Sequence, residues 1–168
     1  MSWEDLHEVV KNWRNLNDER PFIQQQAPFL VDAAEEGLKR KYPDLEIATL
    51  AILELEHRES PKALTSASKI RLALREKGHQ PIPWLMQARS NLKFLKFQDK
   101  PKKNYTNSLY VILRDGFSEN NGRYGLYVGE TTKTVEERFE QHISGIRAGR
   151  GLPKHGIQLL YSLMWPWQ

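Results

Sequence analysis

The sequence predicts an α+β fold in which a helical module, residues 1–98, precedes a β-containing core, residues 107–168. Apolar residues repeat at helical intervals through most of the first hundred residues. Two short runs rich in apolar and β-branched residues, 107–113 and 124–129, then read as strands. The segment 98–107 between the parts is polar, contains a proline and is rich in lysine, so we expect it to be the linker.

Start and stop signals divide the module into helices. The opening Ser2-Trp3-Glu4-Asp5 resembles a capping box, and an aromatic and aliphatic stripe follows it. The apolar stretch 45–55 fits a buried helix or a strand, and its length favours the helix. Proline positions set the remaining boundaries. Further helices are expected at 28–41, after Ser60-Pro61, and from about Trp84.

The two strand-like runs predict a β-hairpin. The intervening segment 114–123 carries Asp-Gly and Asn-Gly turn signals, but it is too long for a tight two-residue turn. After Gly129 the chain turns through a threonine-rich segment, in which a threonine can cap a helix from Val135 to about Ile146.

Four side chains in this region suit phosphodiester chemistry. Tyr110 and Tyr127 come from the two strands, while Arg138 and His142 lie one turn apart on the helix. Phosphodiester cleavage needs a proton acceptor for water, a cation beside the phosphoryl oxygens, and usually a divalent metal. Arginine matches phosphate geometry, histidine titrates near neutrality, and phenols can orient water or phosphate. The alternatives are core tyrosines, a solvated arginine and a helix-face histidine.

The order of these residues resembles the GIY-YIG nuclease superfamily over residues 107 to about 165. Ser108-Leu109-Tyr110 corresponds to Gly-Ile-Tyr of that family, and Tyr127-Val128-Gly129 corresponds to Tyr-Ile-Gly. Thr131, Arg138 and His142 fall at the family's threonine, arginine, and downstream histidine or tyrosine. Five matched points in the same order are more specific than either tripeptide alone.

The resemblance implies a small three-stranded antiparallel sheet flanked by helices, with the apolar run 156–165 as the third strand. It also implies a glutamate beyond that strand that binds Mg²⁺ or another divalent cation, whereas the last acidic residue here is Glu140. We therefore expect no metal ligand in this chain. Either the chain is a fragment that ends before the metal-binding helix, which we favour, or the protein has lost cleavage and kept nucleic-acid binding.

The resemblance implies a role for each candidate. Arg138 would hold the scissile phosphate, and one of Tyr110, Tyr127 and His142 would accept the proton from water; the sequence leaves that choice open. Gly129, Thr131 and Lys133 would support the motif, although a solvated loop lysine is the simpler explanation for Lys133.

Positive charge is concentrated in the middle of the chain. The net charge is +4, and residues 66–103 hold 10 Lys and Arg against 2 Asp and Glu. Such a band can bind a nucleic-acid backbone by releasing counterions, and the alternative is a solvated helix face. The expected nucleic-acid-binding residues are Lys69, Arg71, Arg75, Arg89, Lys93, Lys96, Lys102 and Lys103.

The composition of the chain excludes several classes of protein. No apolar run could span a membrane, no signal peptide is recognisable, and the chain contains no cysteine, so disulfide scaffolds and thiolate zinc sites are excluded. We expect a cytoplasmic metal-dependent endonuclease that acts on DNA, with no membrane partner. The alternatives are a non-catalytic nucleic-acid-binding module and a protein-interaction scaffold that uses the aromatic helices.

Overall fold

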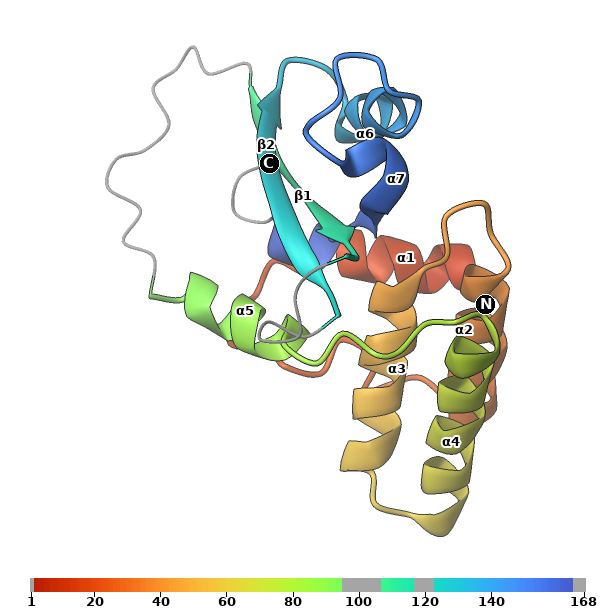
Figure 1. The fold of residues 1–168 in the computed structure, drawn as a ribbon. Helices are drawn as coiled ribbons and strands as arrows, with labels where there is room; N and C mark the ends of the chain where they lie inside the picture. The colour runs from red at the N-terminus through yellow and green to blue at the C-terminus, as the bar shows by residue number, and fades with distance from the viewer. Residues whose placement is uncertain (1, 95–106, 117–122, 165–168) are drawn as a thin grey trace. The chain divides into compact units, whose positions relative to one another are not determined.

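The computed structural model has the expected α+β fold (Figure 1). Its described residues form seven α-helices, a short 3-10 helix and a three-stranded antiparallel sheet. Within this described part of the chain, no helix is both long enough and apolar enough to cross a membrane. The residues that the structure describes are 2–94, 107–116 and 123–164.

The chain divides into two compact units between Ala88 and Arg89. This division lies earlier than the linker expected at 98–107, most of which falls outside the described residues. It falls within helix α5 (Leu85–Leu92), so the chain passes from one unit to the next inside a helix. The sequence does not signal this boundary, because α5 contains no proline or glycine.

The first unit confirms the helices expected before residue 88. The two expected start signals act as caps. Ser2 and Asp5 form a capping box, and the Ser60 hydroxyl accepts a hydrogen bond of 3.2 Å from the Ala63 amide. The stretch from residue 45 is a helix rather than a strand. The helices are α1 (Trp3–Lys11), α2 (Ala27–Leu38), α3 (Leu45–His57) and α4 (Pro61–Glu76).

Helix α3 forms the centre of the first unit. Helices α2 and α4 both pack against it and against each other. Its buried residues lie on almost every side of the helix, which explains why this stretch has no clear polar face in the sequence. The Asp44 carboxylate caps the helix by accepting a hydrogen bond of 3.0 Å from the Ile47 amide.

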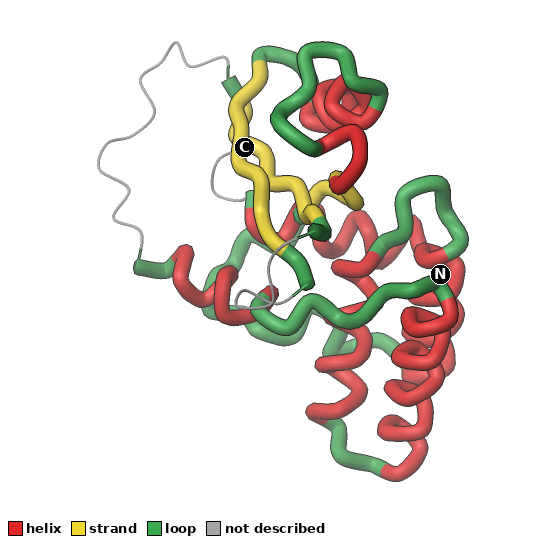
Figure 2. Tube along the Cα trace, viewed as in Figure 1, coloured by secondary structure: helices red, strands yellow, loops and turns green. Residues whose placement is uncertain are grey.

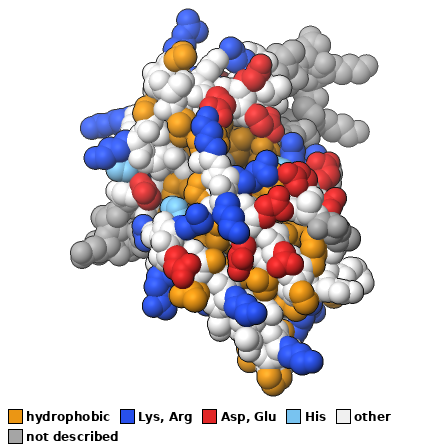
Figure 3. Space-filling view, turned by 90° about the vertical axis from the view of Figure 1, so that its right-hand side faces the viewer, with side chains coloured by type: hydrophobic (Ala, Val, Ile, Leu, Met, Phe, Trp, Pro, Cys, Tyr) orange, Lys and Arg blue, Asp and Glu red, His pale blue; other side chains and the backbone are white. Residues whose placement is uncertain are grey.

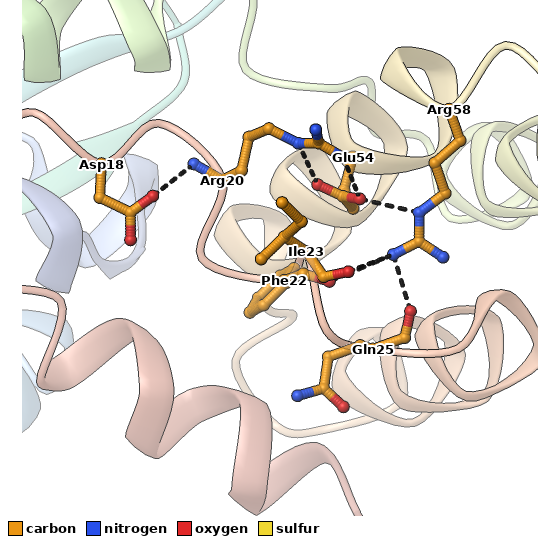
Figure 4. A network of polar contacts seen from close by, with 7 residues as sticks. All are labelled: Asp18, Arg20, Phe22, Ile23, Gln25, Glu54 and Arg58. Carbon is orange, nitrogen blue, oxygen red and sulfur yellow. Dashed lines mark hydrogen bonds and ion pairs between the residues drawn. The ribbon is translucent and has the colours of Figure 1, made fainter.

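One carboxylate of α3 anchors the chain between α1 and α2. Glu54 is 3% exposed, and its carboxylate accepts hydrogen bonds from Arg20 at 2.8 and 3.0 Å and from Arg58 at 2.7 Å (Figure 4). Arg58 also donates to the Phe22 and Gln25 carbonyl oxygens, at 3.2 and 2.7 Å. Two guanidinium groups therefore satisfy the buried charge and hold this connection against α3.

The second unit is built on the expected hairpin. Strand β1 (Ser108–Arg114) pairs in antiparallel register with β2 (Gly125–Thr131), and β3 (Gly156–Leu159) pairs on its other side. The strand order is β2-β1-β3, so β1 is central. Its Ile112 and Leu113 side chains are fully buried, as a central strand requires.

The third strand is shorter than the expected run 156–165. It ends at Leu159, the Leu160 amide still donates to the Val111 carbonyl oxygen at 2.9 Å, and the chain then turns into the 3-10 helix η2 (Tyr161–Leu163). A short helix, α7 (Leu152–His155), precedes the strand and was not expected from the sequence. Its four residues are too few to give a periodic signal.

Helix α6 (Val135–Ile143) follows the hairpin and ends three residues before the expected Ile146. It packs against β1, β3 and α7, and Figure 2 shows both helices on one side of the hairpin. The expected threonine cap is Thr134, whose hydroxyl accepts from the Glu137 amide at 3.2 Å, while the Glu137 carboxylate accepts from the Thr134 amide at 3.1 Å.

Candidate active site

The two tyrosines lie on the same face of the hairpin. Tyr110 is paired with Gly129 across the ladder, and Tyr127 stands two residues before Gly129 on β2. The two phenol rings are therefore diagonal neighbours, with their centroids 6.2 Å apart. Tyr110 is 1% exposed, whereas Tyr127 is only half-buried.

Gly129 makes room for the Tyr110 ring. A β-carbon at this position would lie 2.5 Å from Cζ of Tyr110, which is well inside van der Waals contact. The ring thus lies flat over the glycine backbone, and any side chain there would displace the phenol. This close approach is a physical reason for glycine at the end of the Tyr127-Val128-Gly129 segment.

The turn after β2 sets the position of α6. The Thr131 hydroxyl is buried and accepts a hydrogen bond of 3.0 Å from the Lys133 amide, so both residues shape the turn through local bonding. The Lys133 side chain is exposed. Three residues of α6, Val135, Phe139 and His142, form its buried face, and Arg138 lies beside that face.

His142 and Tyr110 are in direct contact. The Oη atom of Tyr110 lies 2.6 Å from Nε2 of His142, and neither side chain is more than 1% exposed. The His142 ring also meets the Tyr127 ring edge-on, with centroids 5.3 Å apart. Burial lowers the pKa of His142 below its usual value, and the positive charge of Arg138 acts in the same direction. His142 is therefore neutral near pH 7.

Arg138 is held on the open side of this aromatic cluster. Its guanidinium donates hydrogen bonds to Oε1 of Gln141 at 3.1 Å and to the Arg147 carbonyl oxygen at 2.9 Å. Burial, with a smaller contribution from Tyr127, raises the pKa of Tyr110 although Arg138 opposes the shift, so Tyr110 is a neutral phenol.

The segment 144–151, which follows α6, forms the remaining wall of the site. The Gly149 amide donates to Nδ1 of His142 at 2.8 Å. A β-carbon on Gly149 would lie 2.6 Å from Cε2 of Tyr127, so that ring rests on the glycine backbone. Arg147, whose carbonyl binds Arg138, has a φ of 48°, a strained value for a residue with a side chain.

The sequence interpretation missed Gly149. The glycine-rich composition of 144–151 was the one signal that could have pointed to a close backbone approach there. Nothing in the sequence identifies which of its glycines meets the tyrosine. The side chains that were expected to act together do converge: Tyr110, Tyr127, Arg138 and His142 form one cluster, drawn from two strands and one helix.

The residues expected to bind nucleic acid do not all reach solvent. Lys69, Arg71 and Arg75 are all exposed on α4, and Arg71 is ion-paired with Glu56 at 2.7 Å. Arg89 is 1% exposed and donates to the Ser162 carbonyl oxygen at 2.7 Å. Arg89 is therefore a buried structural residue in this fold and cannot reach a phosphate, contrary to the expectation.

Of the remaining candidates in the basic band, the structure describes only Lys93. Lys93 is partly buried at the end of α5, and Lys96, Lys102 and Lys103 lie outside the described residues. On the face of the protein drawn in Figure 3, the lysines and arginines are interspersed with aspartates and glutamates. That face shows no single basic patch.

The described residues do not fit a divalent cation. Among them, no three histidine, aspartate or glutamate side chains are grouped so that they could hold a metal ion. The acidic residues of α6 have other partners: Glu137 belongs to the capping box, and Glu136 accepts a hydrogen bond of 2.8 Å from the Tyr161 hydroxyl. We therefore derive no chemical step through a metal.

Comparison of the chain with models of known protein families, with curated proteins and with solved structures finds no match. The site offers a partly exposed guanidinium and a partly exposed phenol beside a buried, neutral pair of phenol and imidazole.

Proposed function

We propose that the second unit binds and hydrolyses phosphodiester bonds in DNA, as an endonuclease of the GIY-YIG kind. The observation that carries the proposal is the convergence of Tyr110, Tyr127, Arg138 and His142 on one face of the hairpin. These are the residues that the family resemblance selects, and they come from two strands and one helix. A hydrophobic core alone would not need an arginine and a histidine beside two phenols at the same place.

Arg138 is the phosphate-binding group in this proposal. Its contacts with Gln141 and the Arg147 carbonyl use two of its three nitrogens and fix the plane of the guanidinium. Part of the side chain is exposed, so donors remain that can meet the oxygens of a phosphate. A fixed guanidinium loses little side-chain freedom when the phosphate binds, and it opposes the negative charge that grows during attack.

Tyr127 is the phenol that can meet the substrate or the attacking water. It is half-buried, whereas Tyr110 and His142 lie behind it and are almost completely buried. Hydrolysis also needs a group that stabilises the leaving oxygen, and Mg²⁺ or another divalent cation would supply that chemistry if it were bound. The described residues do not form a site for that ion.

The test is cleavage and binding of supercoiled plasmid and of a short DNA duplex by the full chain, with Mg²⁺ or Mn²⁺. Arg138→Ala removes the proposed phosphate ligand, and Arg147→Ala is the matched control because its carbonyl, the atom that contacts Arg138, is retained. We expect cleavage that falls about 100-fold or more in Arg138→Ala. Arg147→Ala should stay close to the parent chain.

A non-catalytic nucleic-acid-binding module is the second candidate. The observation that favours it is that no described carboxylate belongs to the cluster. DNA binding without cleavage, weakened by Arg138→Ala and by added salt, would select this alternative. If neither binding nor cleavage depends on Arg138, both forms of the proposal are wrong.

A further inference from the structure

The contact between Gly149 and His142 determines where the imidazole carries its proton. A backbone N–H can only donate, so Nδ1 of His142, 2.8 Å from the Gly149 nitrogen, must be the acceptor and carry no hydrogen. An imidazolium would place a second donor against the Gly149 N–H. The geometry therefore selects the neutral ring, in agreement with its complete burial.

A neutral imidazole without a hydrogen on Nδ1 must carry it on Nε2. The short contact of 2.6 Å between Nε2 and Oη of Tyr110 is then a bond in which His142 donates and Tyr110 accepts. The hydrogen of the Tyr110 hydroxyl therefore does not lie between the two residues.

We propose that Gly149 fixes the tautomer of His142, so that the imidazole donates its single ring hydrogen to Tyr110. Gly149 and His142 are therefore positioning residues, which together hold the Tyr110 phenol in place.

These two bonds narrow the choice of proton acceptor. Both ring nitrogens of His142 are engaged, so His142 cannot take a proton from water in this arrangement. Tyr110 and Tyr127 remain as candidates, and Tyr127 is the one that is partly exposed. This consequence rests on the proposed function, whereas the tautomer and the direction of the bonds do not.

Nitrogen NMR of the full, ¹⁵N-labelled chain tests the proposal without DNA. Long-range ¹H–¹⁵N correlation spectra distinguish the two neutral tautomers and the imidazolium. Between about pH 6.5 and pH 8, His142 should appear neutral with its hydrogen on Nε2. A scalar coupling across the hydrogen bond should link the Gly149 amide nitrogen to Nδ1 of His142, and this coupling also assigns the signal if a His142 variant does not fold.

His155 provides an internal control. Its Nδ1 lies 2.9 Å from Oδ1 of Asp115, a carboxylate that can only accept, so this ring must carry a hydrogen on Nδ1. The same spectrum should thus show the hydrogen on Nε2 in His142 and on Nδ1 in His155. A second measurement uses Tyr127→Phe, which should leave the His142 tautomer unchanged, because the Gly149 amide sets the tautomer and phenylalanine keeps the ring that lies against Gly149.

Three results would overturn the proposal: a hydrogen on Nδ1 of His142, a charged His142 near pH 7, or a change of tautomer in Tyr127→Phe. None of these results depends on whether the protein cleaves DNA. Conversely, the expected spectra with no DNA cleavage would leave the two hydrogen bonds of His142 in place and contradict only the proposed enzyme activity.

Discussion

The hydroxyl oxygen of Tyr110 lies 2.6 Å from Nε2 of His142, and the two side chains are 1% and 0% exposed. This bond joins the central strand of the sheet to helix α6 at a place that water does not reach. A buried polar pair of this kind is costly to break on one side, because the remaining partner loses its hydrogen bond without regaining water.

The Tyr110→Phe substitution should therefore destabilise the second unit. It removes one oxygen, leaves Nε2–H of His142 without an acceptor, and should lower the free energy of unfolding by about 1–3 kcal/mol. Urea denaturation followed by near-UV circular dichroism measures the change. Tyr127→Phe is the control and should cost less, about 1 kcal/mol or below, because that side chain is half-buried. Equal losses in the two variants would contradict this account of the pair.

Gly129→Ala should displace the Tyr110 ring, since the new β-carbon would lie 2.5 Å from Cζ. Overpacking of this kind costs about 1–3 kcal/mol. A double-mutant cycle with Tyr110→Ala isolates the clash from other effects of alanine on β2. We expect Gly129→Ala to cost much less in the Tyr110→Ala background. The same cost in both backgrounds would show that the ring is not the reason for glycine.

The lowered pKa of His142 predicts a loss of stability in mild acid. Its pKa in the folded protein lies below the ordinary value of 6.5, so the unfolded chain binds the proton first as the pH falls. The stabilising contribution is complete above about pH 6.5 and is lost as the pH falls through the lower, folded pKa.

Unfolding free energies of the parent chain and of His142→Gln, measured at several pH values, test this prediction. The parent should lose stability more steeply below about pH 6.5 than the variant, which lacks the titrating group. The other four histidines are common to both proteins, so their contributions cancel in the comparison. Parallel curves would mean that the pKa of His142 is not lowered by folding.

Among the ionic residues of the first unit, Glu54 should contribute most to its stability. Glu54→Gln leaves Arg20 and Arg58 without their shared carboxylate, and both arginines are partly exposed, at 31% and 23%. We expect a loss of about 2 kcal/mol, less than for a fully buried pair. Glu56→Gln, which breaks the exposed pair with Arg71, is the control and should cost below about 1 kcal/mol. Thermal denaturation of the two variants should separate them, and similar melting temperatures would contradict the prediction.

Local signals made most of the secondary structure predictable. The Ser60-Pro61 start and the threonine cap before Val135 act through neighbouring backbone groups, so they are visible in the sequence. The two tyrosine-bearing runs, rich in apolar and β-branched residues, also predicted the hairpin from local sequence. The short α7 and the end of β3 depend on packing against β1 and α6, which no short stretch of sequence records.

The site was predictable in its side chains but not in its backbone. Spacing placed Arg138 and His142 on one face of α6, and the two strand-like runs supplied the tyrosines. The bond from the Gly149 amide to His142 depends on how the segment after α6 folds back on the helix, and the burial of Arg89 depends on the Ser162 carbonyl, 73 residues away in the sequence. From the sequence alone, a cationic residue is expected to be solvated, because its tertiary partner is not visible there.

Cleavage of supercoiled DNA by the full chain beside its Tyr127→Phe variant, with Mg²⁺ or Mn²⁺ present, tests the central claim most directly. The account predicts nicked and linear products from the parent chain and a fall of about 100-fold or more in the variant, which loses only the outermost hydroxyl of the cluster. An absence of cleavage by the folded parent chain, or equal cleavage by both proteins, would contradict it.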